Sequence, residues 1–317
     1  MRALTRARSA VVAAAIIAAA CAACSSSPAS QSGSVGGGSA GAGFPVTVTT
    51  AAGKVHFASR PGAIVSLAPT ATEMLYAIGA GSQVKAVDSL SDYPPGAPLT
   101  KLSAYQPNAE AIASYKPDLV VISNNLDGIT AKLTALSIPV LYLPAATNVA
   151  GVYAEFTELG AATGHVAQAR TEDQKIRTDI TTIVGSEPKH SAPLTYYYEL
   201  GADPYYSVTD STFIGSLLSL LGMKSIADSA TGAASSGGYP ELSPEFILKA
   251  NPDYILLSDT GSNGGQDAAT VIARPGWSAL TAVQDKHVIV LNADIASRWG
   301  PRIVQLLQTV AAGVKSG

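Results

Sequence analysis

Short apolar runs recur along the chain from about residue 44 onward, and amphipathic stretches separate them. Within each run the apolar residues are continuous rather than alternating with polar ones, which is typical of strands buried on both faces of a sheet. The predicted strands are Ala63–Leu67, Val84–Val87, Leu119–Ile122, Val140–Leu143, Leu194–Tyr198, Tyr254–Leu257 and Val288–Leu291. This pattern predicts an α/β fold with mainly parallel central sheets.

One segment of the sequence occurs twice. Asn108–Ser123 reads NAEAIASYKPDLVVIS and Ser243–Ser258 reads SPEFILKANPDYILLS, so that five residues are identical at an offset of 135 positions. In each copy a capping residue begins a short helix, a proline ends it and a buried strand follows. A looser pair, Pro69–Gly79 and Asp210–Gly222, repeats a helix that starts at a capping Thr or Asp and ends at glycine. The repeat predicts two similar lobes.

The stretch between the two halves contains no proline, and Gly164 is its one interior glycine. A helix of about 20 residues would be about 30 Å long, enough to connect two lobes. The predicted organisation is a signal peptide over 1–23, a flexible tether over 24–43, an N-terminal lobe over 44–162, an interlobe helix over 163–186 and a C-terminal lobe over 187–317.

The first residues have the features of a secretory signal peptide. Three arginines precede the apolar stretch Ala10–Ala20, and small residues lead to Cys21 and Cys24. The apolar stretch is too short for a membrane span. No other cysteine occurs in the chain, which excludes a disulfide, a thiolate zinc site and a cysteine nucleophile from the folded part. Ser25–Gly43 is rich in Ser, Gly and Ala, as flexible tethers are.

Composition excludes several classes of protein. The chain is 47% hydrophobic and 14% charged, which is too apolar for intrinsic disorder. No window after residue 30 is long and apolar enough for an integral membrane protein. The net charge of −3 and the pI of 5.8 lack the basic excess of nucleic-acid binding.

The inventory of motifs favours binding over catalysis. The chain has no P-loop, and its folded part has no G-x-S-x-G motif. The four histidines, His56, His165, His190 and His287, lie far apart without an H-x-x-x-H pair. We therefore predict no catalytic residue, no metal site and no resident cofactor. A metal site assembled in space from distant His and Glu residues stays open as an alternative.

Six segments together resemble a known family, the bilobal solute-binding lipoproteins of bacterial ABC importers with a helical backbone between the lobes, and within it the branch that binds cobalamin and ferric siderophores. The segments are IVSLAPTATEMLYAIGAG (64–81), SDYPPGA (91–97), NAEAIASYKPDLVV (108–121), FIGSLLSLLG (213–222), YPELSPEFILKANPD (239–253) and SRWGPRI (297–303). The resemblance implies two α/β lobes with a ligand cleft between them. It also implies delivery of a small-molecule solute, a cobalamin or a ferric siderophore, to a permease dimer with its ATPase subunits.

The resemblance also covers the cysteine at which a lipid would be attached. It leaves two alternatives for the function. A small residue before Cys24 and the serines after it resemble the lipobox of bacterial lipoproteins, which implies lipidation at Cys24 and anchoring to the outer face of the cell membrane. Three residues before the lipidated cysteine the family prefers Leu, whereas this chain has Cys21 there, so that Cys21 stays open as the lipidated residue. Plain secretion or a retained helix is the other alternative. A haem- or metal-binding protein of the same fold, or an enzyme acting on a tetrapyrrole or chelate, are the alternatives in function.

Aromatic residues are predicted to contact the solute. Tyr105 and Tyr239 each lie just before one of the repeated helices, in matching loops of the two lobes. Rigid amphipathic side chains suit a ligand cleft, and the resembling cobalamin binders carry aromatic contacts in these loops. The alternative is that each ring packs on its own helix. Tyr205 and Tyr206, beside Pro204, are also expected to reach the cleft, whereas some of the tyrosines at 196–198 belong to the core.

Charged residues supply the remaining candidates. Asp294 and Arg298 match a cleft pair of the cobalamin-binding branch, and an exposed i,i+4 surface pair is the alternative. Glu110 and Glu245 occupy equivalent positions in the repeat. In the resembling family, glutamates at these positions pair with arginines of the permease. The alternative is that each glutamate only stabilises the N-terminus of its helix.

Overall fold

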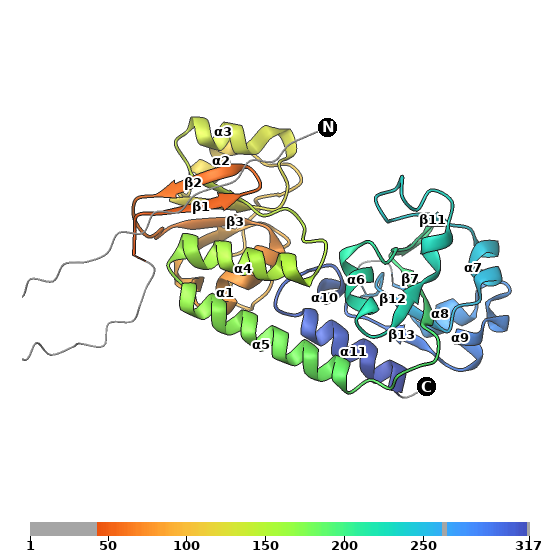
Figure 1. Cartoon of the computed structure of the whole chain (residues 1–317). Helices are drawn as coiled ribbons and strands as arrows, with labels where there is room; N and C mark the ends of the chain where they lie inside the picture. Colours follow the sequence, from red (N-terminus) through yellow and green to blue (C-terminus); the bar gives the residue numbers. More distant parts are fainter. Residues whose placement is uncertain (1–42, 262–264, 316–317) are drawn as a thin grey trace, which may run out of the picture. The chain divides into compact units, whose positions relative to one another are not determined.

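The computed structural model describes residues 43–261 and 265–315, and Figure 1 shows two α/β lobes within this part of the chain. The predicted signal peptide, Cys21, Cys24 and nearly all of the tether lie outside the described residues. Each lobe is built on its own four-stranded parallel sheet. The predicted fold class is therefore confirmed.

The sheet of the N-terminal lobe has the strand order β4-β3-β5-β6, and an antiparallel hairpin of β1 and β2 forms a separate two-stranded sheet. Both central strands, β3 and β5, are buried along their whole length, as the continuous apolar runs predict. The elements of this lobe are β1 Val46–Thr50, β2 Gly53–Phe57, β3 Ile64–Leu67, α1 Pro69–Ala77, η1 Gly81–Gln83, β4 Val84–Val87, α2 Ala109–Ala113, β5 Leu119–Ile122, η2 Leu126–Gly128, α3 Ile129–Ala135, β6 Val140–Tyr142 and α4 Val149–Thr163.

The sheet of the C-terminal lobe has the order β10-β7-β12-β13, and three very short antiparallel strands, β11, β9 and β8, form a second sheet beside it. The elements that follow the interlobe helix are β7 Leu194–Glu199, β8 Gly201–Ala202, β9 Tyr205–Tyr206, α6 Phe213–Ser219, β10 Met223–Ser225, η3 Ile226–Ser229, β11 Glu241–Leu242, α7 Pro244–Ala250, β12 Tyr254–Leu257, α8 Ala268–Ile272, η5 Trp277–Ala279, α9 Thr281–Gln284, β13 Val288–Val290, α10 Ala293–Ala296 and α11 Ile303–Lys315.

The repeated segments form the same structure in both lobes. The Asn108 side chain caps α2 by accepting a hydrogen bond from Ala111 N at 2.8 Å, and Ser243 caps α7 in the same way. The looser repeat differs from the prediction at its caps. Helix α1 begins after Ala68, which makes no side-chain cap, and α6 is capped by Thr212 rather than Asp210.

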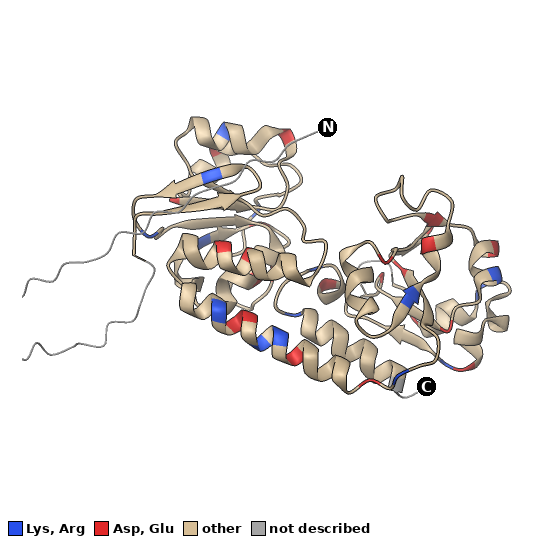
Figure 2. Ribbon diagram, viewed as in Figure 1, with Lys and Arg blue, Asp and Glu red and all other residues tan. Residues whose placement is uncertain are grey.

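The helix expected over 163–186 is α5, Val166–Gly185. It starts later than predicted because Gly164 has a left-handed φ of 76° and ends α4, whose last residue is Thr163. Helix α5 packs against α4 along its first part and against α11 along its last part (Figure 1). Charges of both signs alternate along its exposed surface in Figure 2.

The hydrophobic core is continuous between the lobes. One cluster includes Ile64 of β3, Ile176 of α5 and Leu307 of α11, as well as Tyr196 and Tyr198 of β7. Tyr197 faces the other side of β7 and belongs to a second cluster within the C-terminal lobe. All three tyrosine rings are buried, and their alternation between the two faces agrees with the predicted strand. None of the helices among the described residues is long and apolar enough to cross a bilayer.

Candidate functional site

A cavity of about 420 Å³ lies between loops of the two lobes. The N-terminal lobe contributes residues that follow each of its four parallel strands, and the C-terminal lobe contributes α10 and the turn after it. The lining residues are Pro69, Thr70, Leu90, Tyr105, Ser123, Asn124, Ala145, Asp294, Ser297, Arg298 and Trp299. Small-molecule sites measure roughly 300–1,000 Å³ and in α/β proteins lie at the carboxyl ends of the strands. Both the size and the position make this cavity the candidate site.

Tyr105 provides the exposed aromatic surface of the cavity. Its side chain is 67% exposed, and it lies in the loop that leads to α2. This loop is ordered locally by Ser103, whose Oγ accepts a hydrogen bond from Gln106 N at 3.1 Å. An exposed ring on an ordered loop is available for stacking against a flat solute.

Arg298 lines the same cavity, but its guanidinium is already engaged. Nη2 donates to Leu90 O at 2.9 Å and to Asp92 Oδ1 at 3.0 Å, and lies 3.5 Å from Asp294 Oδ1. Nη1 donates to Glu73 Oε1 at 3.1 Å. Because the side chain is only 8% exposed, the alternative of an exposed surface pair between Asp294 and Arg298 does not describe this geometry.

Glu73 is the centre of a buried ion-pair network that joins the lobes. This residue of α1 is fully buried, and its carboxylate accepts hydrogen bonds from Arg302 Nε at 2.8 Å and Nη2 at 2.5 Å, besides the one from Arg298. Arg302 also lies over the ring of Tyr93, 4.1 Å from the ring centroid. One carboxylate of the N-terminal lobe therefore holds two arginines of the C-terminal lobe.

A second polar contact between the lobes lies beside the cavity. Trp299 Nε1 donates to Glu155 of α4, at 3.0 Å from Oε2 and 3.2 Å from Oε1. Burial is the main cause of a raised pKa of about 8 for Glu155, a net value that includes the lowering effect of the Trp299 hydrogen bond and the raising effect of the nearby Glu158 charge. The Nε1 donor of Trp299 is therefore already bonded within the protein.

The other predicted tyrosines do not line the cavity. Tyr239 is 45% exposed and precedes β11 in the C-terminal lobe. The Tyr205 ring packs on Trp277 at 5.5 Å between centroids, and Arg274 lies over it at 5.1 Å. Tyr206, on the same short strand, is 42% exposed. Tyr205 is therefore part of the packing of its own lobe.

Glu110 and Glu245 lie where the repeat places them. Each is an exposed residue in the first turn of its helix, α2 or α7, one in each lobe. Among the described residues neither carboxylate has an ion-pair partner, and neither lines the cavity between the lobes. The two carboxylates are thus equivalent exposed groups on separate lobes.

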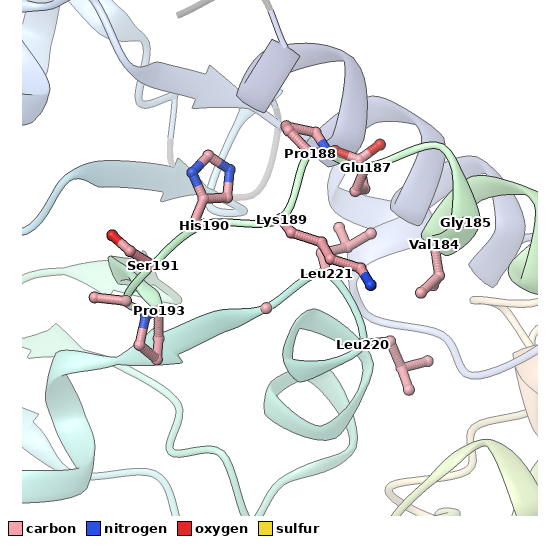
Figure 3. Close-up of a pocket in the computed structure, with 12 residues that line it drawn as sticks. Val184, Gly185, Glu187, Pro188, Lys189, His190, Ser191, Pro193, Leu220 and Leu221 are labelled. Carbon is pink, nitrogen blue, oxygen red and sulfur yellow. The ribbon is translucent and has the colours of Figure 1, made fainter.

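A second cavity, of about 470 Å³, lies at the opposite edge of the C-terminal sheet (Figure 3). It is formed by the segment between α5 and β7, which includes Lys189 and His190, and by Leu220 and Leu221 before β10. This edge carries the amino ends of the strands, whereas ligands of α/β proteins bind at the carboxyl ends. We therefore do not assign the solute site to it.

The histidines are held in separate local contacts. His165 lies 3.0 Å from Gln83 Oε1, His287 stacks on the ring of Tyr254 at 4.4 Å, and His56 lies 3.1 Å from Thr47 Oγ1. Over residues 43–261 and 265–315, no group of three or more His, Cys, Asp or Glu residues is arranged to hold a metal ion.

Sequence reasoning did not identify Glu73, Asp92 or Trp299 as parts of this region. All three lie within segments that carry the family resemblance, IVSLAPTATEM, SDYPPGA and SRWGPRI. Their partners lie more than 140 residues away along the chain, since Glu73 pairs with Arg298 and Trp299 with Glu155. Nothing in a local pattern indicates pairs of that separation.

Comparison with known proteins gives one consistent family. The family model described as "Periplasmic binding protein" matches residues 64–295. An uncharacterized ABC transporter substrate-binding lipoprotein of Bacillus subtilis, YvrC, is 30% identical over 286 residues, which is 86% of each chain. A vitamin B12-binding protein of Pectobacterium atrosepticum is 30% identical over 80% of this chain and 88% of its own. The crystal structure of the periplasmic vitamin B12 binding protein BtuF of Vibrio cholerae matches with a TM-score of 0.66 and 28% identity, covering 81% of this chain and 97% of that one.

Proposed function

Because the chain belongs to the periplasmic binding protein family, we propose that it captures a cobalamin or a ferric siderophore between its lobes and delivers it to the permease of an ABC importer. The observation that carries the proposal is the cavity at the carboxyl ends of the N-terminal strands, with the exposed ring of Tyr105 on its wall. The similarity to vitamin B12-binding relatives supports a corrinoid as the solute.

Calorimetric titration of the purified protein tests this function. Cyanocobalamin, cobinamide, a ferric hydroxamate, a ferric catecholate and haemin are the probes. Saturable, reversible binding of a corrinoid or a ferric siderophore at one site per chain is the expected result. Tight binding of haemin alone would favour the haem-binding alternative, and chemical conversion of a probe would favour an enzyme.

The Tyr105 side chain is expected to contribute directly to solute binding. Tyr105→Ala should weaken affinity by about 1–3 kcal/mol, because the change removes a rigid aromatic anchor from the cavity wall. Isothermal titration measures the loss. Tyr115→Ala is the matched control, since Tyr115 is also exposed but lies between α2 and β5, at the amino end of that strand. Comparable losses in both variants would contradict a role for the Tyr105 ring.

Tyr239→Ala tests whether the solute extends beyond the cavity to the matching loop of the C-terminal lobe. The same loss of about 1–3 kcal/mol is expected if the two loops hold opposite faces of one ligand. Thermal unfolding without solute should be nearly unchanged in both variants, because both rings are exposed.

We propose that Cys24 carries a lipid that anchors the protein to the outer face of the cell membrane. The similarity to a substrate-binding lipoprotein supports this localisation. Cys24→Ala should release the protein from the membrane, because the acyl chains that we propose as its anchor are no longer attached. Cell fractionation with an antibody to the protein measures retention, and Cys21→Ala should leave it unchanged. Release by Cys21→Ala instead would assign the lipid to Cys21.

We propose that Glu110 and Glu245 contact the two subunits of the permease. Their equivalent positions in the first turns of α2 and α7, and their exposure, support the proposal. A transporter with two equivalent subunits presents its contacts twice, which matches one acidic residue in each lobe.

A further inference from the structure

Carboxylates of the protein itself pair with the positive charge of the candidate cavity. Of the described residues that line it, Arg298 is the one with a positive charge. Its Nη2 is shared among Leu90 O, Asp92 and Asp294, and its Nη1 donates to Glu73. Glu73, Asp92 and Asp294 therefore offset the positive charge of Arg298 before any solute binds.

The exposed charge around Arg298 is negative. Glu73, Asp92 and Asp294 supply three carboxylates, which share the two guanidinium groups of Arg298 and Arg302. Glu73 is fully buried, whereas the side chains of Asp92 and Asp294 are 55% and 48% exposed. These two carboxylates approach the guanidinium from opposite lobes and are the charged groups that solvent or a solute can reach.

Neutral polar groups of the cavity add hydrogen-bond acceptors. Asn124 lines the cavity, and its buried Oδ1 has no hydrogen-bond partner. The one strong donor of Trp299, its Nε1 group, is taken by Glu155. Carboxylate and amide oxygens accept hydrogen bonds, so that primary amides or ammonium groups of a solute are their complements.

We propose that this cavity selects solutes that are neutral or cationic and rich in hydrogen-bond donors, and that Asp92 and Asp294 determine the selection. The inference rests on the proposed function, because it concerns the solute bound in the same cavity. Arg298 acts as a positioning residue that holds Asp294 in the cavity wall and Asp92 directly behind it. A solute with peripheral carboxylates, such as haem with its propionates, is disfavoured because the three carboxylates of Glu73, Asp92 and Asp294 outnumber the two guanidinium groups that they share.

A matched pair of corrinoids tests the selection with little change in size. Cyanocobalamin carries peripheral amides, and its monocarboxylate derivatives carry a carboxylate in place of one amide. The wild-type protein should bind cyanocobalamin about tenfold more tightly than a monocarboxylate whose acid group faces this wall, because like charges in a partly buried site repel. Titration of separate monocarboxylate isomers identifies that position. A cationic ferric hydroxamate and an anionic ferric catecholate form the equivalent pair if the solute is a siderophore.

Substitutions assign the selection to particular side chains. Asp294→Asn and Asp92→Asn should each reduce the discrimination between the two corrinoids at least threefold, because one repelling charge is removed while the shape is kept. Asp285→Asn is the control. Asp285 is an exposed residue between α9 and β13, and it therefore lies at the amino ends of the strands, whereas the cavity lies at carboxyl ends. The control should leave the discrimination unchanged.

The possible results distinguish a failure of the proposed charge selection from a failure of the proposed solute-binding function. Binding of cyanocobalamin with equal affinity for every monocarboxylate would overturn the selection and leave the proposed function intact. Unchanged discrimination in both Asp→Asn variants would overturn the roles of Asp92 and Asp294. Preference for the anionic member of either pair would also refute the inference. If no corrinoid and no ferric siderophore binds, the proposed function fails, and the inference fails with it.

Discussion

Replacing Glu110 and Glu245 together by arginine is expected to abolish solute uptake while solute affinity and the fold stay intact. Each carboxylate is exposed in the first turn of a capped helix and lies outside the cavity, so that neither solute binding nor the core depends on it. Charge reversal at both positions would place like charges against basic residues of the permease, and such pairs govern association and the choice of partner. Uptake of labelled solute by cells that produce the variant measures the effect.

The control for this prediction is a double variant with the same change in net charge. Asp179→Arg with Asp285→Arg alters α5 and the residue after α9, away from the two repeated helices. It should transport normally. If the Glu110 and Glu245 glutamates only stabilise their helix N-termini, their reversal costs about 0.3–1 kcal/mol of stability at each helix and leaves uptake unchanged. Normal uptake would therefore reject the docking role.

The strands of the two parallel sheets were predictable because both faces of such a sheet are buried, so that most residues of each strand are apolar. Val84–Val87, Leu119–Ile122 and Tyr254–Leu257 are strands with the predicted bounds, and each belongs to a parallel sheet. The last two are uninterrupted apolar runs that are buried at every position, whereas Val84–Val87 contains one exposed residue, Lys85. The hairpin of β1 and β2 was not predicted. Its strands mix polar and apolar residues and pair only with each other, so that they lack the continuous pattern.

The first residue of the interlobe helix could not be predicted from the amino-acid composition of the segment. The segment at 163–186 has helical composition, and one interior glycine does not exclude a helix. In the structure Gly164 adopts a left-handed φ and separates α4 from α5. The side chains of His165 and Arg60 pack and hydrogen-bond around this turn, and such tertiary contacts are not visible in the local sequence.

The part of the candidate site that lies in loops next to the repeated helices was predictable from the sequence. The repeat places Tyr105 before α2, and the structure brings this residue to the cavity with Asp294 and Arg298. The packing of Tyr205 on Trp277 could not be foreseen, because the two residues lie on different elements of the lobe. The engagement of Arg298 by Glu73 also depends on tertiary structure, since 225 residues separate the two.

The Glu73 carboxylate is expected to be essential for stability because it neutralises two buried arginines. Glu73→Ala should lower the free energy of unfolding by about 3–5 kcal/mol, the loss typical when one partner of a buried ion pair is removed. Arg302 is 11% exposed and loses both of its hydrogen bonds to Glu73, whereas Arg298 keeps Asp92, Asp294 and the Leu90 carbonyl. Chemical denaturation of the protein without solute measures the change.

Glu172→Ala is the matched control for this last prediction. Glu172 pairs with Lys175 on α5 at 3.3 Å, and the partner left behind, Lys175, is 62% exposed although Glu172 itself is only 16% exposed. Exposed pairs contribute about 0–1 kcal/mol, because solvent screens the charges and the side chains lose entropy when they pair. The two variants remove the same side chain and differ in the burial of the partner. A loss in Glu73→Ala no larger than in Glu172→Ala would show that the network between the lobes does not stabilise the fold, and that Arg298 and Arg302 are solvated when Glu73 is absent.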